Sequence, residues 1–392
     1  MRTKIIHFVL LFAFAIPAWA DDAEDAARLE QEQQDAFLSG FTTIIESLNR
    51  NRLELFTSAV DRDNFFDLVF GLRLIDQRVK RDFIERVQQG FDNVLRAGFR
   101  DSKEGIKATL LGIDSRGDQG RALVRFDLPG LQFSYHVYEL RLDEKNRVVI
   151  IDWVDYLQGE GFTDNLGKSL VMASPSRPAV RKLIDYPKVK DADLFQFTEL
   201  LKAARDRNVQ RYVDIINELS PELQRQKFTV LTSVQLAKLV RNRRMLRVSL
   251  VQMAEHFADE PLFSLALLDY YVPSKMYAEA VAGLQRTYDT FGFDDAAMEA
   301  RLSALTLEME NPADANAFAE RAVELEPGLE LAWWSALRAR VAVVDHAGAV
   351  EALQILEQEH GHTLGQPELE RDATFAALLA SDEFAAWAAS RQ

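Results

Sequence analysis

Three side chains in the middle of the sequence have the types that a hydrolytic triad uses. Ser134, His136 and Asp155 would lie on one face of a sheet if the turn at 143–146 pairs Leu142 with Arg147. In such a triad the histidine takes the proton of the serine hydroxyl, and the aspartate orients the histidine. Cross-strand neighbours rarely meet at the angles that this transfer requires, and no nucleophile-turn motif surrounds Ser134. We therefore predict that the protein is not an enzyme and has no catalytic residue.

The same predicted face carries three large side chains, each with a polar end. The register that pairs Leu142 with Arg147 sets His136 opposite Trp153, with Tyr138 beside them. Side chains of this kind line pockets that hold small apolar ligands. Helices could equally fill the concave face of the sheet, in which case the three residues belong to the hydrophobic core. Both interpretations are open from the sequence, and the pocket residues would be His136, Tyr138 and Trp153.

One cluster near the C-terminus has metal-ligand residue types. His360 and His362 flank a glycine and lie close to Glu357 and Glu359. A specific site needs a third ligand held on a rigid element, and the sequence offers none at a regular spacing. The glycines at 159 and 161 are followed by Phe-Thr, without the lysine of a phosphate-binding loop. We therefore predict no metal ion and no cofactor.

The chain is acidic overall, but its charges are unevenly distributed. The formal net charge is −15, which argues against nucleic acid as a partner. Residues 294–392 hold 19 acidic and 6 basic residues, whereas residues 225–247 contain no acid. That basic run predicts a surface for an anionic peptide or lipid headgroup, and a solvated helix face is the alternative. The candidate patch consists of Arg241, Arg243, Arg244 and Arg247.

Residues 1–20 have the order of charged, apolar and small residues that is typical of a secretory signal peptide. Arg2 and Lys4 precede the apolar stretch 5–16, and Ala18 and Ala20 stand before the expected cleavage site. The apolar stretch is shorter than the roughly 20 residues that cross a bilayer. Because the chain has no cysteine, neither disulfides nor a lipid-anchored cysteine is expected. We expect an exported, soluble protein, periplasmic in a bacterium with two membranes and otherwise secreted.

The elements that must position these residues change in type along the chain. Apolar residues recur at helical spacing in residues 22–99, for example Phe37, Phe41, Ile44 and Leu48. From residue 106 the period becomes two, which predicts antiparallel strands at 106–113, 121–128, 131–142 and 147–155. In the second strand, apolar residues alternate with charged ones such as Arg125, as in a sheet covered on one face. Helices followed by a meander indicate an α+β domain.

In element order and length, residues 21–160 resemble the cone fold of the nuclear-transport-factor-2-like superfamily. The resemblance implies helices packed into a curved antiparallel sheet. Isomerases of that superfamily use an aspartate and a tyrosine inside the cone, which would implicate Asp152 and Tyr138. In the predicted register, however, Asp152 points to the face opposite Tyr138.

The C-terminal half has helical period throughout and an internal repeat. Ala280, Ala315 and Ala349 are spaced by 35 and 34 residues, and small residues at these positions let paired helices pack closely. The segment resembles tetratricopeptide repeats, which implies an all-α solenoid with a groove for a protein partner. Pro327 ends one repeat, and Trp333 stands at the aromatic position of the first helix that follows it. The predicted repeat-packing residues are Ala280, Ala315, Ala322, Pro327, Trp333 and Ala349.

These patterns divide the chain into a signal peptide (1–20), an α+β domain (21–160), a linker with short helices (161–190), repeat-like helical pairs (191–260) and tetratricopeptide-like repeats (261–392). We expect a non-enzymatic interaction or scaffold protein that binds a protein or peptide in its repeat groove. The alternative is a periplasmic small-molecule or lipid carrier that uses the α+β domain. If the domains are independent, removing residues 261–392 leaves the α+β domain intact.

Overall fold

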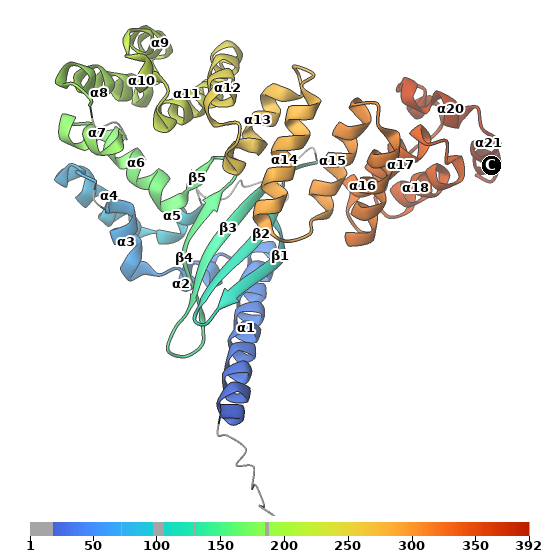
Figure 1. Ribbon diagram of the computed structural model, residues 1–392, viewed down its shortest axis with the longest axis horizontal. Helices are drawn as coiled ribbons and strands as arrows, with labels where there is room; N and C mark the ends of the chain where they lie inside the picture. The colour runs from blue at the N-terminus through green and yellow to red at the C-terminus, as the bar shows by residue number, and fades with distance from the viewer. Residues whose placement is uncertain (1–18, 72, 97–105, 129–130, 185–187, 392) are drawn as a thin grey trace, which may run out of the picture.

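The computed structural model describes residues 19–71, 73–96, 106–128, 131–184 and 188–391, shown in Figure 1. Residues 1–18, which hold most of the expected signal peptide, lie outside this part. A sheet lies at the centre of the molecule, with helices of the N-terminal half on one side and an arc of helices on the other. This arrangement confirms an α+β N-terminal region followed by a helical-repeat region.

The N-terminal helices cover one face of the sheet. The longest, α1 (Trp19–Asn49), presents the predicted stripe to the core, where Phe37, Phe41 and Leu48 have no exposed surface. Its first turns extend away from the sheet in Figure 1. The shorter helices that complete this layer are α2 (Glu54–Ala59), α3 (Arg62–Phe70), α4 (Gln77–Gln89) and α5 (Phe91–Arg96).

Five antiparallel strands form a simple meander in chain order, as the alternating pattern predicts. The first two are joined by the two-residue turn at Gly117 and Asp118, so both are longer than expected. A fifth strand of two residues was not predicted. The strands are β1 (Lys107–Arg116), β2 (Gln119–Leu128), β3 (Gln132–Leu142), β4 (Val148–Asp155) and β5 (Glu160–Gly161).

The predicted register of β3 and β4 is wrong by one residue near the turn and by two beyond it. Leu142 pairs with Val148 rather than with Arg147, and a bulge beside Glu139 then brings Tyr138 opposite Trp153 and His136 opposite Asp155. A shift of two residues keeps each side chain on its face of the sheet. The predicted residues therefore still share one face: Ser134, His136, Tyr138, Trp153 and Asp155. A bulge of this kind cannot be read from alternation alone.

Both faces of the sheet are buried, which corrects the expectation of a sheet covered on one face. One face joins the N-terminal helices in a core that includes Ala122, Val124 and Tyr138. The other face contributes Leu123 and Tyr135 to a second core, shared with the repeat helices. The sheet is therefore the middle layer of the molecule.

Two helices follow β5 and pack on the α+β region. Here α6 (Phe162–Ala173) begins after Gly161, and α7 (Arg177–Leu183) begins after Ser176, whose hydroxyl accepts from the N–H of Ala179. Phe162 stacks on Trp153 with ring centroids 4.0 Å apart, and Ala179 belongs to the first core. The segment thus contains short helices, as predicted for 161–190, and Gly161 and Pro178 stand at their starts.

Ten longer helices then form five consecutive pairs within residues 188–391, which we number repeats 1 to 5. The second helices begin at Val209, Arg243, Tyr277, Pro312 and His346, which are 34, 34, 35 and 34 residues apart. The pairs are α8 (Asp191–Arg205) with α9 (Val209–Glu218), α11 (Lys227–Leu239) with α12 (Arg243–Phe257), α13 (Ser264–Tyr271) with α14 (Tyr277–Phe291), α15 (Ala296–Glu308) with α16 (Pro312–Leu325), and α17 (Glu330–Ala342) with α18 (His346–Gln358).

Short elements connect and end the repeats. These are α10 (Pro221–Gln224), η1 (Pro261–Phe263), α19 (Gln366–Leu369), η2 (Ala373–Phe375), α20 (Ala376–Leu379) and α21 (Asp382–Ala389). Phe375, Phe384 and Trp387 pack onto repeat 5 and cover its outer side. None of the described helices is long and apolar enough to cross a membrane.

The repeat period therefore extends through residues 191–258, where the sequence suggested only irregular pairs. Ala280, Ala315 and Ala349 are all buried at the fourth position of their helices. The equivalent positions in repeats 1 and 2 are Tyr212 and Leu246, so a search for small residues cannot align them. Tyr212 fits because its hydroxyl lies 2.8 Å from Ser233 Oγ in the next pair.

The other predicted packing residues lie between repeats 4 and 5. Ala322 is fully buried in α16, and Trp333 is buried in α17. Trp333 Nε1 donates to the carbonyl oxygen of Pro327, which lies after the end of α16, over 2.6 Å. The indole thus ties the end of one repeat to the first helix of the next.

Candidate functional site

The residues of the suggested triad form a buried polar cluster. Ser134 Oγ donates to Asp155 Oδ1 over 3.0 Å, and His136 Nε2 lies 3.7 Å from Asp155 Oδ2. His136 Nδ1 lies 3.2 Å from the hydroxyl of Tyr138. Burial alone would raise the pKa of Asp155, but the nearby His136 and the hydrogen bonds from Leu157 N–H and Ser134 Oγ lower it to about 2. The serine hydroxyl thus donates its hydrogen bond to the aspartate and not to the histidine. The cluster stabilises the pairing of β3 with the end of β4.

The predicted pocket residues lie among aromatic rings. Tyr138 has no exposed surface and Trp153 is 2% exposed. The Tyr138 ring meets Phe41 and Phe56 edge-on, with centroids 5.2 and 6.0 Å away. A ligand on this face would have to displace the N-terminal helices. Asp152 lies on the other face, where it accepts from Thr163 Oγ1 over 2.5 Å.

The opposite face of the sheet carries a charged cluster that the sequence analysis missed. Arg125 of β2 is fully buried and donates to Asp295 Oδ1 over 2.6 Å and to both carboxylate oxygens of Glu326 over 2.8 and 2.9 Å. Tyr135, its partner across β3, donates to Asp295 Oδ2 over 2.5 Å. Asp295 caps α15 and Glu326 follows α16, so one strand residue joins the sheet to both helices of repeat 4.

The electrostatics of this cluster follow from burial and pairing. Burial alone would lower the pKa of Arg125, but its hydrogen bonds to Glu326 and the charges of Asp295 and Asp127 raise it above its ordinary value. Burial and the charge of Asp295 raise the pKa of Tyr135. A cation with several carboxylates keeps its charge inside the protein. The signal in the sequence was the apolar series Phe133, Tyr135 and Val137, which alternates on the same face as Arg125.

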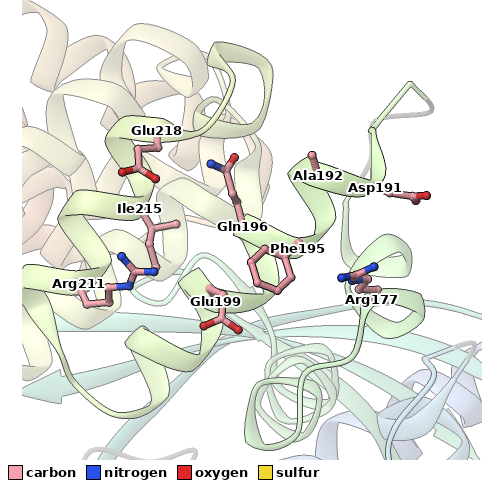
Figure 2. Close-up of a pocket in the computed structure, with 9 residues that line it drawn as sticks. All are labelled: Arg177, Asp191, Ala192, Phe195, Gln196, Glu199, Arg211, Ile215 and Glu218. Carbon is pink, nitrogen blue, oxygen red and sulfur yellow. The ribbon is translucent and has the colours of Figure 1, made fainter.

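Figure 2 shows a wide hollow between α7, α8 and α9, with a volume of about 630 Å³. Phe195 lies at its centre, between Arg177 on one side and Arg211 on the other. The Phe195 side chain is half exposed, and the guanidinium of Arg177 lies 5.4 Å from its ring centroid. Charges of both signs surround this single ring, so the hollow offers little continuous apolar surface.

A second hollow runs beside β3 and along the first helices of repeats 3, 4 and 5. Two adjoining cavities of about 410 and 440 Å³ share Leu131, Ala300, Ala304 and Leu331, so they form one groove. Ala300 and Ala304 of α15 make a low floor where a peptide backbone could approach. The β2–β3 connection borders one side of the groove through Leu131. The further lining residues of the second cavity are Leu307, Glu330, Trp334, Ser335, Arg338 and His362.

Two arginines line this groove, Arg301 in the first cavity and Arg338 in the second. The Arg301 guanidinium lies over the Phe133 ring, 5.1 Å from the centroid, and donates to the carbonyl oxygen of Leu131 over 3.4 Å. Within the described residues, no carboxylate lies within ion-pair distance of Arg301, and burial lowers its pKa although the charges of Tyr135 and Asp269 oppose that shift. Asp269, which pairs with Lys238, lines the same cavity.

The remaining predicted residues lie on the surface of the repeats. Arg241, Arg243, Arg244 and Arg247 are all exposed at the turn between α11 and α12. His362 Nε2 lies 2.7 Å from Glu330 Oε1, and no group of three or more metal-ligating side chains occurs in the described part of the chain. The four arginines are thus exposed, which fits both a binding patch and a solvated helix face, and the groove along α15 and α17 was not predicted.

No protein-family model matches the chain, and no curated protein matches it. Among solved structures, the crystal structure of PilW, described as a widely conserved type IV pilus biogenesis factor, is similar over 52% of this chain and 94% of its own length. The sequence identity is 11% and the TM-score is 0.33. A likeness of this size carries no inference about the present chain, whose function must be argued from its own residues.

Proposed function

We propose that this protein is an exported, non-enzymatic scaffold of the tetratricopeptide-repeat type, which holds an extended segment of a protein partner between α15 and α17. The observation that carries the proposal is the groove along α13, α15 and α17, with small residues on its floor and with Arg301, which has no ion-pair partner within the described chain, at its side. Export, to the periplasm or out of the cell, rests on the sequence of residues 1–20.

The lining residues define the segment that fits. An apolar side chain packs against Leu307 and Trp334 in the second cavity. An acidic group of the same segment reaches Arg301 in the first cavity, where it gains a charge-assisted hydrogen bond in a partly buried site. An extended segment can contact both cavities, because they adjoin at Ala300 and Ala304, one helical turn apart on α15.

The test is selection of a displayed random-peptide library on the mature chain, residues 21–392. We expect enriched peptides that combine an apolar with an acidic residue. Replacing the exposed Ala304 with tryptophan fills the groove, so binding of these peptides should weaken by about tenfold or more, the effect of losing roughly one well-packed contact. Binding is measured by fluorescence anisotropy.

The matched control is Ala192→Trp, which places the same bulk on an exposed alanine of α8, in the hollow of Figure 2. It should leave peptide affinity unchanged. Arg301→Gln should remove the preference for acidic peptides over their amidated counterparts. Peptides that bind Ala304→Trp as well as the unmodified protein, and lose affinity in Ala192→Trp, would place the site in the other hollow and overturn the proposal.

A further inference from the structure

The turn between the two helices of every repeat has the same backbone form. One residue takes a left-handed conformation and is followed by the residue that caps the second helix. Equivalent positions in stacked repeats fall in a row along one edge of a solenoid. The left-handed residues, with φ between 54° and 63°, are Arg207, Arg241, Lys275, Glu310 and Val344.

In repeats 1 to 3 the left-handed residue of the turn is a cation. Further arginines lie in the first turns of the second helices. All of these side chains are exposed, and no ion pair joins any of them to a carboxylate of the described chain. Two acids close to them in sequence, Asp206 and Asp269, pair instead with Arg205 and Lys238. The cationic edge consists of Arg207, Arg211, Arg241, Arg243, Arg244, Arg247 and Lys275.

Local folding does not explain these residues. Arg243 and Arg244 occupy the first turn of α12, which has no acidic residue, although the positive end of a helix disfavours cations. The left-handed conformation of Arg241 suits glycine or asparagine better than arginine. These cations stand where the helix dipole or the left-handed backbone disfavours them, in a protein of net charge −15. They therefore indicate an anionic partner outside the chain.

Exposed aliphatic side chains accompany the cations. Leu239 and Val248 are 57% and 59% exposed on either side of the α11–α12 turn, and Val272 is exposed just before Lys275. Guanidinium groups match phosphate oxygens, and aliphatic side chains next to them favour the boundary between lipid headgroups and acyl chains. An acidic protein would engage the arginines but would leave these aliphatic side chains without a role. We propose that the cationic edge binds the surface of an anionic phospholipid membrane.

The test is cosedimentation of the mature chain with vesicles of phosphatidylcholine, alone or mixed with phosphatidylglycerol. The unmodified protein should bind only the mixed vesicles, and less as salt is added. The triple variant R207Q/R241Q/K275Q should bind them on the order of 100-fold more weakly, since each cation near an anionic surface contributes about fivefold. The control R78Q/R116Q/R371Q removes three exposed cations elsewhere and should retain binding.

Two further probes separate a membrane from an acidic protein. Leu239→Ser with Val248→Ser should weaken vesicle binding, whereas binding of poly-glutamate through the arginines would be unaffected. Failure of the unmodified protein to bind mixed vesicles overturns the proposal, as does equal loss in the control triple. Binding of poly-glutamate without binding of vesicles also overturns it and assigns the edge to an acidic protein. Ala304→Trp, which fills the groove, should bind vesicles normally.

Discussion

The first helices of repeats 2 and 5, α11 and α17, occupy equivalent positions but meet different neighbours. Val230, Leu231 and Val234 of α11 join the core that contains the outer face of the sheet. By contrast, Glu330, Trp334 and Arg338 of α17 line an open groove. Repeat 4 lies between these two situations, because Asp295 at the start of α15 binds Arg125 of the sheet whereas Ala304 of the same helix borders the groove.

The packing of the sheet on the repeats bears on the expectation that the α+β domain stays intact when residues 261–392 are removed. The outer face of the sheet, including Phe133 and Tyr135, is buried against residues of that segment. Arg125 would also lose both Asp295 and Glu326. We now expect the truncated chain to be unstable.

The largest predicted effect is at the cluster that joins sheet and repeats. Arg125→Ala removes the buried cation and leaves the carboxylates of Asp295 and Glu326 unpaired. Breaking a buried pair in this way costs about 3–5 kcal/mol of unfolding free energy. Urea denaturation measures it, with Arg116→Ala at the exposed end of β1 as a control that changes stability little. A small loss for Arg125→Ala would show that the sheet and repeats are held together by other contacts.

The next effect concerns a close contact between the turn before β5 and the repeats. Gly159 has φ +78°, and a Cβ there would lie 2.6 Å from the Phe263 ring. Gly159→Ala should therefore cost roughly 2–4 kcal/mol, from left-handed strain and overpacking together.

Its control is Gly117→Ala in the β1–β2 turn. This glycine also has positive φ, but a Cβ there meets nothing within 4 Å, so only strain of about 1 kcal/mol is expected. Thermal unfolding of both variants gives the difference. Equal losses of thermal stability in the two variants would mean that the added Cβ at residue 159 does not disturb the packing on Phe263.

A smaller effect should appear as a pH dependence at Asp155. Its folded-state pKa of about 2 lies below the ordinary value of 3.8, so the ionised group stabilises the fold above about pH 4 and this contribution is lost as pH falls towards 2. Asp155→Asn should therefore be less destabilising at pH 2.5 than at pH 6, by about 2 kcal/mol. Urea unfolding at both pH values measures it, and Asp114→Asn on the exposed side of β1 is the control.

The smallest effect should come from the last repeat turn. Val344 is exposed and holds φ 63°, a conformation that a β-branched residue rarely adopts. Val344→Asn should raise the unfolding free energy by about 1 kcal/mol, because asparagine tolerates the left-handed region. Thermal unfolding measures the change. Val343→Asn, one residue earlier and outside that region, should show no gain.

Much of the fold could be predicted because it follows local patterns. The helical stripe from Phe37 to Leu48 and the meander follow from apolar periodicity, and the last three repeats follow from buried alanines. The period of repeats 1 and 2 was not predicted, because Tyr212 and Leu246 stand where the later repeats have a small residue. Their turns keep the period through backbone conformation, which a single sequence does not display.

The candidate groove was less predictable, because it depends on contacts across the whole chain. Leu131 and Arg301 are 170 residues apart, and the sheet must first pack on the repeats before they meet. Arg125 resembled a solvent-facing residue in an alternating strand, although its face also carries Tyr135 and Val137. The basic patch was predictable, because a run of arginines without acids rarely becomes buried.

Hydrogen exchange of the mature chain, with and without a peptide selected on it, tests the central claim most directly. The account predicts slower exchange in residues 296–308 and 330–342, which form α15 and α17, and unchanged exchange in α8 and α11. Slowing confined to residues 191–218, around the hollow of Figure 2, would contradict it. In that case the groove of repeats 4 and 5 would not be the binding surface.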